Sequence, residues 1–316
     1  MESKLNILFL GGARRTSLAE RFIGAGKKLG KKVDIFSYEL MSEVPLIAVA
    51  RKIIIGKRWN DPQILDHLKS IIADNNIHIV LPFVDPAVEV LARLKTEYHR
   101  HDLAVPVSDL TVAQTFFDKV CTQQWFIKHG FPVPEAKDSY PIIAKPRKGS
   151  AAKGLAILQN DQQKAIFFQN HSPDDYLLQA YLEADEYTVD AYVSIHERKI
   201  LGMVPRQRIE VFNGEVIKSV TVRDEEILSC SEKILMSAPF EGPITLQYLR
   251  ERKTGKLYIM EINPRFGGGV INSIEAGFDI PLLLLQEYMH IPVKPIANWQ
   301  ENLVMMRTFK EIFVCR

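Results

Sequence analysis

The chain has 316 residues, of which 47% are hydrophobic and 25% are charged. This length favours two or three units that share a cleft, and the composition is typical of a soluble globular protein. The 40 Lys and Arg residues nearly balance the 38 Asp and Glu residues, so the formal net charge of +2 gives no support for nucleic-acid binding. An N-terminal apolar run of about six residues is too short for a signal peptide or a membrane span, so we expect a cytoplasmic protein without membrane contact. Cys121, Cys230 and Cys315 form no C-x-x-C pair, which speaks against disulfides and a cysteine metal site.

Strands and helices alternate over the first hundred residues. Short apolar segments predict strands at 5–12, 32–38, 51–56 and 77–85. Amphipathic patterns predict helices over 16–30 and 61–76, the second with Asp61 as its N-cap and Pro62 at its first position. This alternation favours a parallel sheet with helices on its faces. The first glycine turn, "GGARR", lacks the G-x-G-x-x-G spacing, so its role as an anion site stays open.

The pattern changes after residue 108. One long helix is expected over 109–130, with Asp109 as its N-cap and Gly130 at its end. Four further segments follow: a strand at 141–146, a strand at 155–158, a helix from Asp161 and a strand at 176–182. Beyond residue 186 the pattern is mostly alternating strands with hairpin turns, and "NG" at 213–214 is a strong hairpin signal. The second part of the chain is therefore expected to be α+β with mainly antiparallel sheet.

A predicted hairpin over 243–264 brings three side chains with oxygen atoms together. If residues 253–255 form a three-residue loop closed by Arg252 and Lys256, Gln247 faces Glu261 across the ladder. Asn263 then lies two residues further on the same face. Two amide oxygens and one carboxylate suit Mg²⁺ that keeps water and phosphate oxygens as its other ligands. On the hairpin alone, a solvated face with polar pairs is an open alternative, and a shift by one residue would separate the three side chains.

Several cations are candidates for phosphate contacts. Lys119 lies on the predicted long helix and Lys145 ends the strand at 141–146, and ammonium groups bind phosphate oxygens as point charges. The basic loop "RKGSAAKG" at 147–154 offers backbone N–H groups and Lys148 or Lys153 to a polyphosphate.

Arginines and glycines follow in the second half. In "MEINPRFGGG", Arg265 adds a cation, and the glycines at 267–269 allow the backbone to approach a ligand. In "VPRQRIEVFNGE", Arg206 and Arg208 are candidates for a contact with the γ-phosphate or an acyl-phosphate, and we choose Arg208. Exposed arginines on a sheet surface are the open alternative.

No G-x-x-x-x-G-K-[ST] motif occurs, so a P-loop is excluded. The segment "LLQAYLEADE" is the candidate for holding a nucleotide base instead. The Gln179 side chain offers a donor and an acceptor to an adenine edge, and Glu186 can accept from ribose hydroxyls. The backbone of Ala180, Tyr181 and Leu182 can also contact the base.

Together these motifs resemble the ATP-grasp superfamily, and within it the single-module relatives of the carbamoyl-phosphate synthase large subunit. The resemblance spans nearly the whole chain, and "EINPR" is its sharpest element. It implies a role for each matched residue: Lys119 and Lys145 on phosphates, Gln179 and Glu186 on adenine and ribose, Gln247, Glu261 and Asn263 on metal, and Arg265 on phosphates or the reacting intermediate. It also implies a Rossmann-like pre-ATP-grasp domain at 1–110, a small lobe with its lid and linking helix at 111–185, and a large lobe with the metal site at 186–316.

The resemblance further implies an ATP-dependent ligase that uses Mg²⁺, or Mn²⁺ in its place. Such an enzyme phosphorylates a small carboxylate, and an amine-like acceptor then displaces the phosphate. The "FGGGVINS" stretch after "NPR" resembles carboxylate-amine ligase-like members, and we expect the acceptor between it and the first domain. Two alternatives stay open: a carbamoyl-phosphate synthase-like activity on bicarbonate, weakened because the chain has room for one module, and an ATP-binding module without turnover. The oligomeric state stays open, with a homodimer as the candidate assembly.

Overall fold

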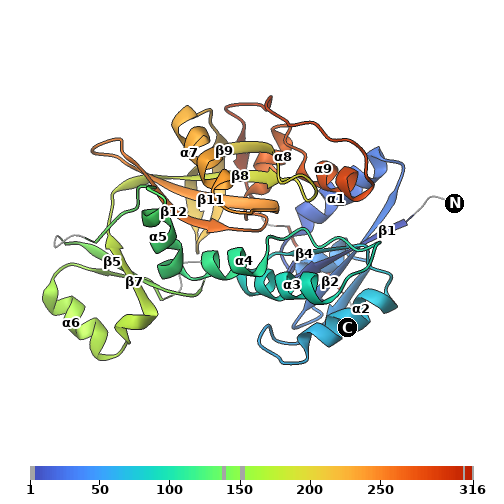
Figure 1. The fold of residues 1–316 in the computed structure, drawn as a ribbon, viewed down its shortest axis with the longest axis horizontal. Coiled ribbons are helices and arrows are strands. Elements are labelled where there is room, and N and C mark those ends of the chain that lie inside the picture. The colour runs from blue at the N-terminus through green and yellow to red at the C-terminus, as the bar shows by residue number, and fades with distance from the viewer. Residues whose placement is uncertain (1–3, 137–139, 150–153, 309, 315–316) are drawn as a thin grey trace.

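The first sheet of the computed structural model, which describes residues 4–136, 140–149, 154–308 and 310–314, is parallel and four-stranded (Figure 1). Its strand order is β3-β2-β1-β4, with β1 (Lys4–Leu10), β2 (Lys32–Glu39), β3 (Lys52–Ile55) and β4 (Ile79–Pro82). Helix α1 (Thr16–Lys28) packs on one face, whereas α2 (Ile64–Asp74) and α3 (Asp85–Glu97) pack on the other. The short helix η1 (Pro45–Ala48) follows β2. The predicted parallel sheet with helices on both faces is therefore confirmed.

Helix α2 begins later than the sequence predicts. Asp61 was expected to cap the helix and Pro62 to open it, but α2 begins at Ile64. The Asp61 carboxylate instead accepts a hydrogen bond from Gln63 N at 2.8 Å, and its carbonyl accepts from Ile64 N at 3.1 Å. A turn therefore closes on Asp61 before the helix begins.

The single long helix predicted over 109–130 is wrong, because the chain breaks at Asp118. Helix α4 (Leu110–Phe117) is capped by Asp109, as predicted, and helix α5 (Lys119–Lys128) follows it. Asp118 has an extended backbone, and its carboxylate accepts from Val120 N and Cys121 N at 2.9 and 3.3 Å. Aspartate is among the best N-caps because its oxygen satisfies free N–H groups of the first turn, so it favours a new helix start here.

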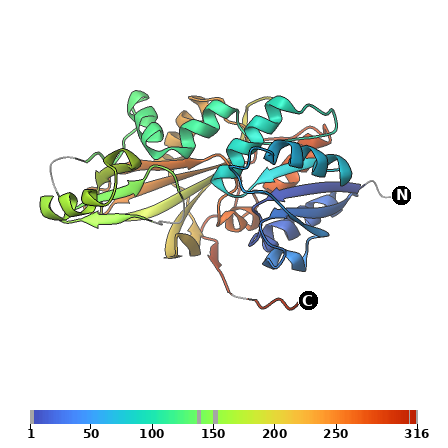
Figure 2. The same cartoon turned by 90° about the horizontal axis from the view of Figure 1, so that it is seen from below.

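A three-stranded antiparallel sheet lies at the end of the molecule opposite to the first sheet (Figures 1 and 2). Its order is β6-β5-β7, and it consists of β5 (Ile142–Pro146), β6 (Ala156–Leu158) and β7 (Tyr176–Ala180), with α6 (Asp161–Gln169) and η2 (Pro173–Asp175) between β6 and β7. Its core is small, with Ile142, Ala144 and Leu158 at the centre.

A six-stranded sheet lies between the other two, in the order β12-β11-β8-β9-β10-β13. Its strands are β8 (Ala184–Val193), β9 (Ile200–Phe212), β10 (Glu215–Thr221), β11 (Gly242–Glu251), β12 (Leu257–Asn263) and β13 (Val304–Met306). All described pairings within it are antiparallel, and the predicted turn at 213–214 joins β9 to β10. Three helices that the strand pattern did not predict accompany it: α7 (Glu225–Met236), α8 (Val270–Glu275) and α9 (Ile280–Tyr288).

The first sheet and the six-stranded sheet share one hydrophobic core. Phe9 and Phe22 from the first unit belong to the same cluster as Phe266 and Phe278, and Phe266 stacks on Phe83 with 6.0 Å between ring centroids. Helices α4 and α5 pack against the six-stranded sheet, although the sequence assigned them to the range 111–185. The division into three ranges stays a prediction. The loop around Phe266 packs into the core that the two sheets share.

No helix within the described ranges is long and apolar enough to cross a bilayer. Cys121 and Cys230 are free thiols, and Cys315 lies outside the described residues.

Candidate active site

The β11–β12 hairpin places the predicted metal ligands side by side. Gln247 pairs with Glu261, and Asn263 pairs with Thr245, so Glu261 and Asn263 project from the same face of β12. The Asn263 Nδ2 atom donates to Glu261 Oε1 at 3.0 Å. The predicted pairing of Gln247 with Glu261 is therefore confirmed.

The predicted hairpin loop is wrong, but Gln247 still pairs with Glu261 because β12 contains a bulge. Arg252 and Lys256 do not close the loop; Glu251 N donates to Lys256 O at 3.0 Å. Pairs near the turn are shifted by one residue, as in Leu249 with Tyr258, and the register changes between Gln247 and Tyr248. One extra residue on β12 thus restores the expected pairing at the site, as a β-bulge does. Gly255 has the predicted left-handed φ, at 72°.

Arg208 on β9 lies beside these ligands. Its Nη1 atom is 3.4 Å from Gln247 Oε1 and 3.3 Å from Glu186 Oε2, and its side chain is 9% exposed. Burial lowers the pKa of Arg208, an effect that Glu186 opposes. Arg208 is thus no exposed surface arginine, and it connects the predicted ribose contact Glu186 to the predicted metal ligands.

Lys145 reaches the same place from the small sheet. It lies on β5, and its charge interacts with Glu261, Lys119 and Glu186. Burial lowers the pKa of Lys145, Glu261 and Glu186 oppose this effect, and Lys119 adds to it. The charge of Lys145 thus acts on a second lysine and on two carboxylates, and the phosphate-binding roles of the two lysines stay a prediction.

The base of the predicted lid is held by Asp118 and Arg147. Arg147 Nη2 lies 2.8 Å from Asp118 Oδ2, and Lys119 Nζ donates to Gly149 O at 2.8 Å. Burial raises the pKa of the Asp118 carboxyl, whereas the bonds from Arg147 and from the backbone N–H groups of α5 together lower it by more. The net result is a lowered pKa. Lys148 is exposed, with its Nζ 5.7 Å from the centroid of the Phe117 ring, and Lys153 lies outside the described residues.

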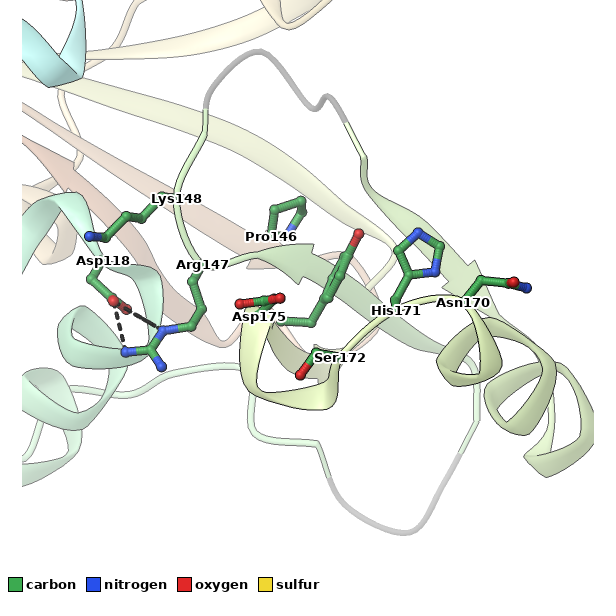
Figure 3. A pocket seen from close by; sticks show the side chains of 9 residues that line it. Asp118, Pro146, Arg147, Lys148, Asn170, His171, Ser172 and Asp175 are labelled. Carbon is green, nitrogen blue, oxygen red and sulfur yellow. Dashed lines mark hydrogen bonds and ion pairs between the residues drawn. The ribbon is translucent and has the colours of Figure 1, made fainter. Parts of the chain in front are cut away.

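A pocket of about 650 Å³ opens beside this base, where Asp118 and Arg147 point toward each other (Figure 3). It is lined by Asp118, Pro146, Arg147, Lys148, Asn170, His171, Ser172, Asp175 and Tyr176. Lys148 is the one predicted site residue among them. Because neither Lys145 nor Glu261 lines this pocket, we do not place the nucleotide phosphates in it.

The predicted adenine segment is partly engaged by the protein itself. Gln179 is buried, and its Nε2 donates to Gln123 Oε1 at 2.7 Å, whereas its Oε1 has no hydrogen-bond partner among the described residues. The N–H groups of Ala180 and Tyr181 donate to the carbonyls of Pro134 and Pro141. Two N–H groups of the segment are thus in use, while the N–H of Leu182 has no backbone partner in the described part of the chain.

Arg265 links the metal ligands to the first sheet. Its Nε lies 2.6 Å from Asp85 Oδ1 at the start of α3, and its Nη2 donates to Asn263 Oδ1 at 3.3 Å. Asp85 was not predicted, because nothing in the sequence around it indicates that it meets a residue 180 positions away.

Two of the three glycines after Arg265 pack on a buried ion pair that the sequence analysis missed. Arg206 Nε lies 2.7 Å from Asp190 Oδ2, and both side chains are almost fully buried. A Cβ atom at Gly267 would lie 3.0 Å from Asp190 Oδ1, and one at Gly269 would lie 2.5 Å from Arg206 Nη1. At Gly268 the nearest atom would be Arg15 Nη1 at 3.6 Å. The expected approach to a ligand stays a prediction for Gly268, whereas Gly267 and Gly269 approach the protein's own side chains closely.

The backbone N–H groups of the first glycine turn interact with a carboxylate of the protein itself. The Glu39 carboxylate at the end of β2 accepts hydrogen bonds from the backbone of Gly12 and Ala13, and from Ser37 Oγ at 2.6 Å. Burial raises the pKa of Glu39, and these three bonds oppose that effect. Because a carboxylate already holds these N–H groups, the turn is not free to bind a phosphate through them.

Part of the chain matches a known protein family. Residues 172–310 match the family described as "ATP-grasp in the biosynthetic pathway with Ter operon". The carbamoyl phosphate synthase large chain of Clostridium perfringens (strain SM101 / Type A) is 25% identical over 153 residues. This match covers 45% of the chain and 14% of that relative, so the chain spans a small part of it.

Solved structures show the same fold over almost the whole chain. The N5-carboxyaminoimidazole synthetase from Staphylococcus aureus, solved with ADP, has a TM-score of 0.74 at 19% identity and covers 98% of this chain and 83% of its own. The biotin carboxylase domain of the Hydrogenobacter thermophilus 2-oxoglutarate carboxylase has a TM-score of 0.70 at 15% identity, with 94% and 72% covered. These matches show that the chain has the ATP-grasp fold and that its residues 172–310 match an ATP-grasp family.

Proposed function

We propose that the chain is an ATP- and Mg²⁺-dependent ligase that activates a carboxylate as an acyl-phosphate and transfers the acyl group to an amine-like acceptor. The observation that carries this proposal is the position of Lys145, whose charge interacts both with Glu261, on the strand of the proposed metal ligands, and with a second ammonium group, that of Lys119. Ligases of this kind need cations around a transferring phosphoryl group more than they need an acid or a nucleophile.

The residues present fit ATP and Mg²⁺. The buried Oε1 of Gln179 has no hydrogen-bond partner in the part of the chain that the structure describes, and an adenine amino group would supply the missing donor. Glu261 would bind the metal through its carboxylate, with Gln247 and Asn263 adding amide oxygens. No three His, Cys, Asp or Glu residues in the described ranges form a group that could hold a metal, so the amide oxygens and the phosphates would complete the shell. Bound Mg²⁺, or Mn²⁺ in its place, would offset negative charge on the phosphates.

The side chains would then divide the work of the first step. Lys145 and Lys119 would bind phosphate oxygens, while Arg208 and Arg265 would offset charge that builds up near the γ-phosphate. An oxygen of the substrate carboxylate attacks the γ-phosphorus, the bond to the bridging oxygen breaks, and ADP leaves with that electron pair. Positioning of the two reactants supplies much of the rate in such a transfer.

In the second step, the amine nitrogen attacks the acyl carbon, and inorganic phosphate leaves with the electrons of the broken C–O bond. The nitrogen loses one proton as the amide forms. Exclusion of water matters here because water would hydrolyse the acyl-phosphate.

The test is a screen for ADP and phosphate release across amino acids, small carboxylates and bicarbonate. We expect ADP release that depends on an amino acid or a small carboxylate, on Mg²⁺ and on an amine. Glu261→Ala should lower this rate by at least about 100-fold, because the metal loses its charged ligand. Circular dichroism should show an unchanged fold. Activity of the variant at the wild-type rate would contradict the proposed metal site.

Bicarbonate is the second candidate for the activated carboxylate. The matched relatives include a carbamoyl phosphate synthase large chain, and the Hydrogenobacter thermophilus domain was solved with bicarbonate. ADP release with bicarbonate alone would favour this candidate, and tight ATP binding without any turnover would favour a binding module. We also propose a cytoplasmic location, where ATP is made available, and a homodimer, as described for that carboxylase domain.

A further inference from the structure

Four arginines gather around the glycines at 267–269, and we call Arg15, Arg206, Arg265 and Arg307 the arginine cluster. Arg15 lies at the start of α1, and its Nη1 would be 3.6 Å from a Cβ atom at Gly268. Arg307 follows β13, and its Nη2 donates to the carbonyl of Gly268. The cluster therefore joins the first sheet, the loop after β12 and the end of the six-stranded sheet.

Three members of the arginine cluster have a carboxylate partner. Arg206 pairs with Asp190 at 2.7 Å and Arg265 pairs with Asp85 at 2.6 Å. Arg307 pairs with Glu215 at 3.2 Å. Each of these positive charges is matched by a negative charge at contact distance.

Arg15 is different, because its guanidinium makes no hydrogen bond or ion pair with any described residue. Burial and the charge of Arg265 lower the pKa of Arg15 to about 10, Arg307 adds to this effect, and Glu215 and Asp85 oppose it. The group is still protonated at neutral pH. A partly buried guanidinium with five N–H donors, no acceptor and cations nearby is a poor arrangement unless an anion binds to it.

We propose that Arg15 binds a carboxylate or phosphate group of the second, non-nucleotide substrate, and so selects for an anionic substrate. This inference rests on the proposed ligase function for the identity of the substrate. Arg15 neighbours Arg265, which contacts Asn263, so the bound anion lies next to the metal side of the site. The nucleotide phosphates belong to Lys119 and Lys145, which reach the site from α5 and β5 instead.

The side chain of Arg15, and not the turn that carries it, is the binding group. Glu39 holds the N–H groups of Gly12 and Ala13, so the backbone donors of this turn are not available to an anion. A planar guanidinium also matches the two oxygens of a carboxylate or phosphate, which a lysine at this position would not do.

The test measures binding of inorganic phosphate and of succinate at constant ionic strength, by calorimetry, in wild type and in Arg15→Gln. We expect the variant to bind at least about tenfold more weakly, because it loses a charge-assisted pair of hydrogen bonds. Binding of either anion through Arg15 supports the proposal, and the tighter one identifies the group. The neighbouring Arg14→Gln is the matched control, since Arg14 is exposed and should change binding by no more than about twofold.

Lys145→Ala separates this inference from the proposed function. This variant loses the proposed phosphate contact of the nucleotide, so Mg-ADP binding should weaken. The contribution of Arg15 to phosphate or succinate binding should stay the same. In Arg15→Gln the opposite is expected: Mg-ADP binding stays and anion binding is lost. If Arg15→Gln fails to fold, Arg15→Lys takes its place, with binding several-fold weaker than wild type. Equal anion binding in wild type and the Arg15 variants, or equal loss in Arg14→Gln, would overturn the proposal.

Discussion

Lys145 combines burial with charges of both signs, and its titration should therefore control nucleotide binding. Its pKa is lowered from 10.5 by burial, with Lys119 adding to the effect of burial and Glu261 and Glu186 opposing it. A triphosphate favours the ammonium form, so binding raises this pKa again and takes up a proton at alkaline pH. Affinity for Mg-ATP should hence be constant near neutral pH and fall as pH rises through the lowered pKa, before an ordinary lysine titrates.

The measurement is the dissociation constant of Mg-ATP as a function of pH in wild type and Lys145→Arg. Arginine stays protonated over this range, so the fall in affinity should move to higher pH in the variant. Identical pH profiles for the two proteins would show that another group causes the fall.

Gly268 and Gly269 form a matched pair for a packing test. A Cβ atom at Gly269 would lie 2.5 Å from Arg206 Nη1, and Arg206 belongs to a buried ion pair. Gly269→Ala should lower the free energy of unfolding by about 1–3 kcal/mol, the usual cost of overpacking. Gly268→Ala meets only Arg15 Nη1 at 3.6 Å, so it should change the free energy by less than about 0.5 kcal/mol. Urea denaturation checks both values, and equal losses would refute the packing explanation.

Single residues were predictable where a motif carried them. The order of Lys119, Lys145, Gln247, Glu261 and Asn263 is visible in the sequence. The structure pairs Gln247 with Glu261, and the charge of Lys145 interacts with Glu261 and Lys119. Arg15, Asp85 and Asp190 carry no local pattern, because their partners lie far away in the chain. The one available signal was Asp190 itself, a charge within the otherwise apolar stretch "TVDAYV".

Asp118 joins two elements, since it begins helix α5 and holds the base of the lid. Its carboxylate accepts from the first turn of α5 and pairs with Arg147 at 2.8 Å. We expect Asp118→Ala to lower the free energy of unfolding by about 1 kcal/mol through the lost cap. It should also weaken Mg-ATP binding by about tenfold, because Lys119 and the lid base lose their support.

Asp109→Ala provides the control, because Asp109 caps helix α4 through Val112 N and has no described contact with the lid. It should lose similar stability and leave Mg-ATP affinity within about twofold of wild type. Denaturation and nucleotide titration of both variants test this. If both variants weakened nucleotide binding alike, helix stability and not the lid connection would be the cause.

Elements were predictable from periodicity where tertiary contacts agreed with local preference. The parallel strands of the first sheet and the turn at 213–214 follow their patterns closely. The break at Asp118 was missed because apolar residues continue on both sides of it, and the bulge in β12 leaves no trace in an alternating pattern. Helices α7, α8 and α9 were not predicted, because the pattern beyond residue 186 indicated mostly alternating strands with hairpin turns.

At the scale of the molecule, the fold class is confirmed, with a parallel sheet, a small antiparallel sheet and a large antiparallel sheet. What the sequence could not predict is that the first sheet and the largest sheet share a core through residues such as Phe266. Contacts between segments so far apart depend on packing that no local pattern encodes. The same contacts bring Arg15 and Arg307 to one place.

The contact between Arg265 and Asp85 connects two sheets of the molecule. One guanidinium nitrogen of Arg265 contacts Asp85 on helix α3, and another donates to Asn263 on β12. Arg265 therefore links the first sheet to the strand of the proposed metal ligands. A phosphate that competes for Arg265 would loosen its hold on Asp85. Occupancy at the reacting centre is therefore expected to weaken the link between Asn263 and helix α3, while the core that the two sheets share stays intact.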